Sequence, residues 1–315
     1  MLTVIFTSFN GELTVGRMLA ALCDLAPPDG GWKLVAADNC STDRTGEIMR
    51  SFQGRLPITV ISVNARGKNR ALNQAINHVG GDLVVFTDDD VIPDRQWLRK
   101  LEECAREHPA HQMFSGPILP HWPREPDRWI LESVYLEMAF ALSDPALKDG
   151  EIPPESVWGP NMVIRRTLFA QGLRFSTNIG PDGTNAYMMG SETEFTRRVA
   201  KTGAKAWFCA SATVQHMIRE NQLSEDWILQ RYFRHGRSAY FFADRGPPDV
   251  PTILGVERWL YGQLLSSRVR AMGQLLFGNR KARFVAMAGY HFAKGRIHQS
   301  RLMHESRKGN AGAEG

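Results

Sequence analysis

Three consecutive aspartates, Asp88, Asp89 and Asp90, follow the apolar run LVVFT and precede a second short apolar run that ends at Pro93. Adjacent carboxylates repel one another, so folding alone gains little from such a triplet. Carboxylate oxygens are ligands of hard divalent cations, and a bound cation leaves positions open for the oxygens of a substrate diphosphate. Asp88 and Asp90 point to the same side of an extended chain. The triplet therefore predicts a site for Mn²⁺ or Mg²⁺; the alternative is a solvated acidic turn.

The segments that precede and position this triplet are alternately strand-like and helix-like in their spacing of apolar residues. Short apolar segments at 2–9, 33–38, 58–63 and 82–87 are typical of buried strands, and apolar spacing over 15–22, 43–52 and 72–79 favours helices. This order predicts an α/β fold with a Rossmann-like, mostly parallel sheet flanked by helices. Ligands of such sheets bind beyond the carboxyl ends of the strands.

Polar residues stand at those strand ends. Thr7 and Asn10 follow the first strand, Asp38 the second and Arg66 the third, while the aspartates follow the fourth. We therefore expect a binding crevice at this edge of the sheet.

The rest of the chain contains further helical and strand-like segments. Helices are expected at 97–107, 128–142 and 191–203, and one or two strands at 205–216. We expect a large α/β domain at 1–222 that consists of two halves, 1–95 and 96–222. A helical, basic C-terminal region at 223–315 follows, and its last residues are expected to be disordered.

Composition fits a folded globular chain: 43% of the 315 residues are hydrophobic and 23% are charged. The four cysteines form no Cys-x-x-Cys pair, so we expect them to be reduced. The N-terminus has no secretory signal, and no apolar run approaches the roughly 18–20 residues that span a bilayer. These features predict a cytoplasmic protein.

Several segments, taken in order, resemble the family-2 glycosyltransferases of the GT-A fold. They are TSFNGELTVGRMLAAL, AADNCSTDRTGEI, NRALNQAINHVGGDLVVFTDDDVIP, WGPNMVIRRTLFAQGLRF, GSETEFTRRVAKTG and ATVQH, between residues 2 and 217. The resemblance implies inverting, metal-dependent transfer of a hexosyl or N-acetylhexosaminyl group from a nucleotide-diphosphate sugar, most often a UDP-sugar. The acceptor would be a saccharide or a lipid-linked hydroxyl, in the synthesis of cell-surface polysaccharide or glycolipid. The resemblance also implies that 1–222 is the catalytic domain, with 1–95 as its nucleotide-sugar-binding half and 96–222 as its acceptor half.

The resemblance also implies roles for individual residues. Thr7 and Asn10 match positions near the nucleoside, Asp38 matches the carboxylate that accepts a hydrogen bond from the base, and Ser41 belongs to the family's Ser-x-Asp. Ser41 or Thr42 could instead cap the following helix.

The diphosphate and the donor sugar have their own candidate residues. The aspartates match the family's Asp-x-Asp motif, so that Asp88 and Asp89 would bind the donor, and Asn161 matches the floor beneath the donor sugar. Arg66, Lys68 and Arg70 precede or begin a helix, where cations and backbone N–H groups together suit a diphosphate. A solvated basic loop is the alternative there.

The implied metal ligands are Asp88, Asp90 and His216. An imidazole ligand favours Mn²⁺ over Mg²⁺. An ordinary hydrogen-bonded histidine is the alternative for His216.

The resemblance implies that the catalytic base lies in GSETEF, where family members usually carry Glu-Asp. Alignment on the glycine gives Glu192 the place of the base. Ser191 and Glu194 have the spacing of a capping box, which would give Glu194 a structural role. We therefore expect Glu192 to deprotonate the acceptor, and a one-residue shift in the motif would transfer that role to Glu194.

The C-terminal region is strongly basic. From Arg258 to Lys308 there are eleven Lys and Arg and one acidic residue, Glu305. Interspersed aromatic and aliphatic residues favour helices that lie on an anionic membrane, peripherally at its inner face. A solvated helix face is the alternative, and no recognition motif for nucleic acid is visible.

Other functions have weaker support. A nucleotidyltransferase would need a glycine-rich phosphate loop after the first strand, and a dinucleotide-dependent oxidoreductase would need Gly-x-Gly-x-x-Gly there; TSFNGELTVG has neither. A noncatalytic nucleotide- or saccharide-binding relative is favoured only by the altered GSETEF.

Overall fold

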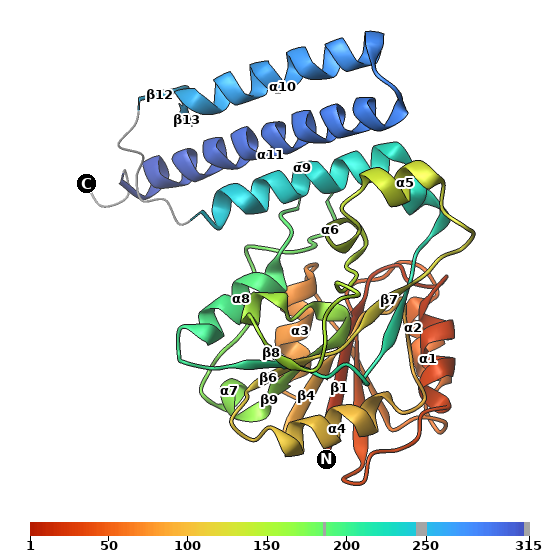
Figure 1. Cartoon of the computed structure of the whole chain (residues 1–315). Helices are drawn as coiled ribbons and strands as arrows, with labels where there is room; N and C mark the ends of the chain where they lie inside the picture. The colour runs from red at the N-terminus through yellow and green to blue at the C-terminus, as the bar shows by residue number, and fades with distance from the viewer. Residues whose placement is uncertain (185–186, 244–250, 312–315) are drawn as a thin grey trace. The chain divides into compact units, whose positions relative to one another are not determined.

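The computed structural model describes residues 1–184, 187–243 and 251–311 (Figure 1). The first part of the chain alternates strands and helices as expected: β1 (Leu2–Ser8), α1 (Val15–Cys23), β2 (Trp32–Asp38), α2 (Thr45–Ser51), β3 (Ile58–Ser62), α3 (Lys68–Ile76) and β4 (Leu83–Phe86). Adjacent strands in this part pair in parallel, β2 with β1 and β3, and β1 with β4. The predicted α/β fold with a mostly parallel sheet at its centre is confirmed.

Four later strands extend the same sheet: β6 (Met113–Ser115), β8 (Gly150–Ile152), β9 (Met162–Arg165) and β10 (Ala206–Phe208). The sheet then has eight strands in the order β3-β2-β1-β4-β9-β6-β10-β8. β9 runs antiparallel to both β4 and β6, so it reverses the strand direction next to the end of β4. This stretch of the chain also contains α4 (Trp97–Glu107), α7 (Arg166–Ala170), α8 (Ser191–Ala200) and the short 3₁₀ turns η1 (Pro154–Ser156) and η2 (Gly159–Asn161).

A second, three-stranded sheet continues from the aspartate triplet. It consists of β5 (Val91–Pro93), β11 (Val214–Met217) and β7 (Ile118–His121), with β11 in the middle. His216 is paired with Val91 in this sheet, one residue after Asp90. The expected strand region at 205–216 is therefore two strands, which belong to different sheets.

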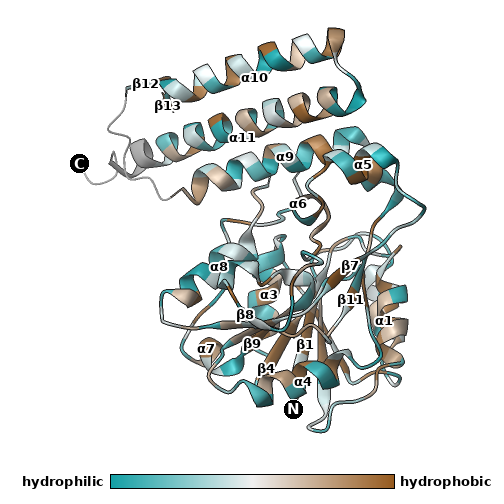
Figure 2. Ribbon diagram, viewed as in Figure 1, coloured by the Kyte–Doolittle hydropathy of each residue, from teal (hydrophilic) through white to brown (hydrophobic). Residues whose placement is uncertain are grey.

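The core explains why the central strands are apolar along their whole length. Helices cover the main sheet, so every residue of β1 and β4 is buried. In Figure 2 these strands are drawn largely in brown, the hydrophobic end of the scale. Phe86 and Phe195 are both buried in the cluster that joins β4 to α8.

The C-terminal part of the chain is helical, as the sequence predicts. It contains η3 (Glu220–Leu223), α9 (Glu225–Phe241), the hairpin β12 (Thr252–Ile253) and β13 (Val256–Glu257), α10 (Arg258–Phe277) and α11 (Arg280–Ala311). The single helix expected at 128–142 is two, α5 (Arg128–Ser133) and α6 (Leu136–Phe140), because Val134 between them is extended. No helix within the described ranges is both long enough and apolar enough to cross a membrane.

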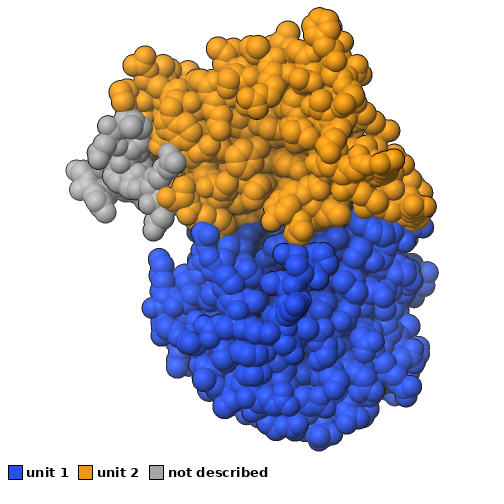
Figure 3. Space-filling view, in the orientation of Figure 1, with its two compact units in different colours: residues 1–123, 140–185, 190–218 blue, residues 124–139, 186–189, 219–315 orange. Residues whose placement is uncertain are grey.

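Two compact units make up the chain (Figure 3). Unit 1 holds both large sheets and consists of residues 1–123, 140–185 and 190–218. Unit 2 consists of residues 124–139, 186–189 and 219–315. All the residues of the candidate site described below belong to unit 1.

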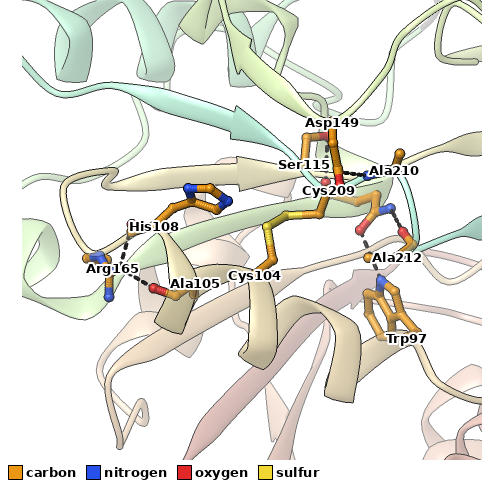
Figure 4. The surroundings of a disulfide bond; sticks show 11 residues. Trp97, Cys104, Ala105, His108, Ser115, Asp149, Arg165, Cys209, Ala210 and Ala212 are labelled. Atoms are coloured by element: carbon orange, nitrogen blue, oxygen red, sulfur yellow. Dashed lines mark hydrogen bonds between the residues drawn. A yellow bond between two sulfur atoms is a disulfide. The ribbon is translucent and has the colours of Figure 1, made fainter.

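A disulfide joins two of the four cysteines, so the expectation that all four are reduced is wrong. Cys104 in α4 and Cys209 after β10 are 105 residues apart in sequence, yet their Cα atoms are 6.2 Å apart (Figure 4). The Cys209 N–H donates to the Ser115 carbonyl (2.7 Å) and so continues the pairing of β10 with β6, beside α4. Cys23 and Cys40 are free.

Reduction should lower stability, because the disulfide closes a long loop in the unfolded chain. A bond of this kind typically contributes about 2–4 kcal/mol. We expect dithiothreitol to lower the unfolding midpoint of the wild type, and the Cys104→Ser/Cys209→Ser variant to show that lower midpoint without reductant. Cys23→Ser/Cys40→Ser is the matched control and should respond as the wild type does. A midpoint of the wild type that does not change on reduction would contradict the disulfide.

Candidate active site

One ammonium group joins the aspartate triplet to the predicted catalytic base. The Lys68 Nζ atom donates to Asp88 Oδ1 (2.8 Å) and to Glu192 Oε1 (2.9 Å), and all three side chains are mostly buried. Lys68 is the first residue of α3, Asp88 follows β4, and Glu192 lies in the first turn of α8. The start of α3, the segment after β4 and the first turn of α8 are distant in sequence, and they meet at the Lys68 ammonium.

Two glycines bring the helix starts into place. Gly67 precedes α3 with a φ of 136°, and Gly190 precedes α8 with a φ of 88°. Both values lie in the region that disfavours a side chain, so glycine allows the sharp entry into each helix. Lys68 and Glu192 follow these turns closely and so point toward the end of β4.

The electrostatics of the cluster are dominated by opposite charges at short range. Burial alone would raise the pKa of the Glu192 carboxyl, but the Lys68 ammonium and hydrogen bonds from Lys68 and Ser191 outweigh it and lower the pKa to about 2. Burial would likewise lower the pKa of Lys68, but Asp88 and Glu192 raise it above its ordinary value. At neutral pH the cluster therefore holds one cation and the ionised Glu192.

Glu194 points elsewhere. Its carboxylate accepts two hydrogen bonds from Arg198 on the next turn of α8, at 2.5 and 3.1 Å. The expected capping box is wrong: Gly190 is the N-cap of α8, and the Ser191 hydroxyl donates to Glu192 Oε2 (2.8 Å). Glu194 still has a structural partner, but that partner is an arginine.

A second pair of predicted residues lies beside this cluster. His216 Nε2 is 3.2 Å from Asp90 Oδ1, and both residues are buried. His216 Nδ1 is 2.6 Å from the Phe140 carbonyl, which fixes Nδ1 as the protonated nitrogen and turns Nε2 toward Asp90. Burial by itself disfavours the imidazolium, but Asp90 and the Phe140 carbonyl raise the pKa of His216 above its ordinary value.

The three expected metal ligands are only partly assembled. Within the described ranges, no group of three His, Cys, Asp or Glu side chains is arranged to hold a metal ion. Asp90 and His216 lie together, whereas Asp88 is bound to Lys68. The 3.2 Å between Nε2 and Oδ1 is close to the roughly 3 Å that separates neighbouring ligands in octahedral coordination with bonds of about 2.1 Å. The donor atoms of Asp90 and His216 therefore fit two adjacent ligand positions of a divalent cation.

Asp89 contacts the segment after β1. The Ser8 hydroxyl donates to Asp89 Oδ2, and Gly11 packs so closely on both side chains that an added Cβ would overlap them. Asp89 thus joins the carboxyl ends of β1 and β4, where the expected donor site begins.

The residues expected near the nucleoside form one hydrogen-bonded group. The backbone N–H of Asn10 donates to Ser41 Oγ (3.1 Å), and the Ser41 N–H donates to Asp38 Oδ1 (3.0 Å). Thr7 is buried at the end of β1. Ser41 and Thr42 do not cap the next helix, because α2 begins only at Thr45.

Of the three basic residues after β3, Lys68 is the one that binds the carboxylates of Asp88 and Glu192. The Arg66 guanidinium lies over the Phe9 ring, 4.7 Å from its centroid, and Arg70 is exposed on α3. Sequence spacing treated the three as equivalent. The start of α3 at Lys68, four residues earlier than the apolar pattern indicates, is what separates them.

Asn161 is completely buried rather than presented to a ligand. Its amide accepts from Trp97 Nε1 (2.9 Å) and donates to the carbonyls of Ala212 (2.8 Å) and Pro117 (3.3 Å). These bonds fix η2, whose Gly159 lies against the Glu192 carboxylate. Asn161 therefore supports the wall of the site in this structure.

Acid should destabilise the protein through Glu192. Because its folded pKa is depressed to about 2, the stabilisation is complete above its ordinary value of 4.5 and is lost as the pH falls toward 2. At about 1.4 kcal/mol per pH unit, the shift corresponds to roughly 3 kcal/mol. In urea unfolding between pH 6 and pH 3, Glu192→Gln should start less stable than wild type and decline less steeply. Glu132→Gln, at an exposed glutamate on α5, is the control, and parallel pH profiles for Glu192→Gln and wild type would refute the ion pair.

Comparison with known proteins supports the fold and the family. The family described as Glycosyl transferase family 2 matches residues 3–171. The succinoglycan biosynthesis protein ExoM of Rhizobium meliloti is 26% identical over 225 residues, which cover 70% of this chain and 68% of ExoM. A glucosyl-dolichyl phosphate glucuronosyltransferase of Haloferax volcanii is 22% identical over 158 residues, half of each chain.

Two solved structures are similar over most of the chain. The mannosyltransferase PcManGT from Pyrobaculum calidifontis, in complex with GDP-Man and Mn²⁺, has a TM-score of 0.59 and 19% identity, covering 95% of this chain and 86% of its own. TarS 1–349 of S. aureus, in complex with UDP-GlcNAc, has a TM-score of 0.54 and 16% identity, covering 95% and 91%. The family match spans more than half of the sequence and both structures share its fold, so this chain belongs to glycosyl transferase family 2 and has the GT-A fold.

Proposed function

We propose that this protein transfers a hexosyl or N-acetylhexosaminyl group, with inversion, from a nucleotide-diphosphate sugar to an acceptor hydroxyl. The observation that carries the proposal is the meeting of Lys68, Asp88 and Glu192 at the carboxyl end of β4. Activation of a hydroxyl requires a base, and departure of a diphosphate requires positive charge. This region holds a candidate base, a cation and a cluster of acidic ligands.

The donor is proposed to lie along the ends of β1, β2 and β4. The group formed by Asn10, Asp38 and Ser41 would bind the nucleoside, and Thr7 and Asp89 would line the path to the diphosphate. Arg66 and Arg70 are close enough in sequence to Lys68 to meet the phosphates from the α3 side. A UDP-sugar is the leading candidate, and it is also what TarS binds; PcManGT binds GDP-Man.

Asp90 and His216 are proposed to hold a divalent cation, Mn²⁺ or Mg²⁺, and Asp88 would join them once Lys68 moves away. Such a cation supplies positive charge that stabilises the departing nucleotide diphosphate. The Phe140 carbonyl accepts from His216 Nδ1 and so keeps Nε2 directed toward Asp90. PcManGT, of the same fold, is in complex with Mn²⁺.

Glu192 is proposed as the general base. A base works best with a pKa near the working pH, and the ion pair with Lys68 holds the pKa of Glu192 at about 2. A bound diphosphate offers Lys68 a stronger anionic partner. When Lys68 turns to it, Glu192 loses its cation, its pKa rises because it is buried, and it can accept the proton of the acceptor hydroxyl as that oxygen attacks the sugar carbon. Donor binding thus prepares the base.

The acceptor is proposed to be a saccharide or a lipid-linked hydroxyl in polysaccharide or glycolipid synthesis. ExoM is named for succinoglycan biosynthesis, and the Haloferax relative is named for a lipid-linked substrate. A peripheral position on the inner face of a membrane, with 1–222 as the catalytic domain and 223–315 as the basic region, completes the proposal.

The reaction is tested with a donor panel. We expect release of nucleoside diphosphate from one of UDP-glucose, UDP-GlcNAc and GDP-mannose, with water or alkyl glycosides as acceptors, and loss of release in EDTA that Mn²⁺ restores. Asp90→Asn should lower the rate and raise the Mn²⁺ concentration needed. Tight binding of a nucleotide without any turnover on the whole panel would favour the noncatalytic alternative.

The base is tested by a matched pair of variants on one helix turn. Glu192→Gln should lower kcat by about 10²–10⁴-fold, since it removes the proton acceptor. Glu194→Gln should keep kcat within about three-fold of wild type, since it removes the ion pair with Arg198 but leaves the proton acceptor Glu192 in place. Steady-state rates with the active donor measure both, and the reverse ranking would assign the base to Glu194.

A further inference from the structure

One face of helix α10 is buried against its neighbours. Leu260 and Ala271, eleven residues apart and therefore on one side of the helix, are buried, and Gln263 accepts a hydrogen bond from Arg296 of α11 (2.8 Å). Trp259 lies under the Arg296 guanidinium, 4.5 Å away. Figure 1 shows α11 between α9 and α10, so this face of α10 packs on α11.

The opposite face of α10 is apolar and exposed. Leu265, Val269, Met272 and Leu276 are spaced by four, three and four residues, which places them in one stripe, and they are 64%, 62%, 56% and 73% exposed. At about 100° per residue the stripe is roughly half a turn from Leu260 and Ala271. We call these four residues the α10 stripe. Phe277, 90% exposed, lies just beyond its end.

Cations flank the α10 stripe. Arg258, Arg268 and Arg270 of α10 are exposed, as are Arg280, Lys281 and Arg283 at the start of α11, and no acidic residue occurs from 258 to 304. Figure 2 shows hydrophilic and hydrophobic residues in turn along α10. An exposed apolar stripe with basic flanks is the pattern of helices that lie in the interface of a lipid bilayer.

Charge decides among the possible partners of this surface. A second copy of the chain would place one set of arginines against another, which costs energy. A nucleic acid would pair with the cations but leave the stripe in water. An anionic bilayer provides a partner for the cations and for the α10 stripe. Its phosphates would pair with the arginines, and its acyl boundary would bury the apolar side chains.

We propose that α10 lies flat on an anionic lipid bilayer, with Leu265, Val269, Met272 and Leu276 in the acyl boundary and Arg268 and Arg270 at the headgroups. This deepens the peripheral position proposed above. It is independent of the transfer reaction, because binding to vesicles needs no nucleotide sugar.

The test is co-sedimentation of the full chain with phosphatidylcholine vesicles that contain or lack one quarter phosphatidylglycerol. We expect binding to the anionic vesicles and weak binding to the neutral ones. Val269→Gln/Leu276→Gln should lower the partition coefficient about ten-fold on anionic vesicles. Arg268→Gln/Arg270→Gln should lower it about as much on anionic vesicles and little on neutral ones.

Matched controls keep the result specific. Leu13→Gln replaces an exposed leucine of unit 1, and Arg106→Gln/Lys201→Gln removes two exposed cations of unit 1; both should bind as the wild type does. Circular dichroism confirms that each variant is folded. Equal binding by the stripe variant and wild type overturns the proposal, as does absence of vesicle binding. So does sedimentation showing a dimer that the stripe variant loses while neither protein binds vesicles.

Discussion

The contact of the Lys68 ammonium with two carboxylates is the interaction on which the site depends. Asp88 and Glu192 come from different parts of the chain and would repel each other without it, and their burial makes an uncompensated charge costly. One cation shared by two carboxylates leaves the cluster with a net negative charge. The cluster is stable while Lys68 contacts both carboxylates. A phosphate that binds Lys68 would break these contacts and let the carboxylates rearrange.

Residues outside this cluster hold its side chains in place. Gly67 and Gly190 set the directions of α3 and α8, and Asn161 fixes η2 behind Glu192 through its bonds to Trp97 and two carbonyls. The turn of the chain from main sheet to second sheet at the aspartate triplet brings Asp90 next to His216. Rigid support of this kind is what keeps reacting groups in position.

The fold was largely predictable from sequence, because buried parallel strands and amphipathic helices leave strong periodic patterns, as in β1, β4 and α1. The site was predictable in part: strand-end position placed Asp88 and Asp90 correctly in space, and motif order placed His216 and Glu192 near them. Sequence spacing could not show that Lys68, and not Arg66 or Arg70, binds the carboxylates. The start of α3 at Lys68 depends on a long-range hydrogen bond from the Lys68 N–H to the Pro181 carbonyl (2.9 Å), which local sequence does not reveal. Nor could sequence spacing pair Cys104 with Cys209, which only the packing of α4 beside β6 and β10 brings together.

We propose that Lys68 is shared between the base and the donor phosphates, and a crystal structure with Mn²⁺ and a nucleoside diphosphate would reveal this exchange of partners. We expect metal density at Asp90 Oδ1 and His216 Nε2, the Lys68 Nζ atom within hydrogen-bonding distance of a phosphate oxygen, and a Glu192 carboxylate no longer in contact with Lys68. Nucleotide bound at the ends of β1 and β2 with Lys68 still bridging Asp88 and Glu192, and no metal at Asp90, would contradict it.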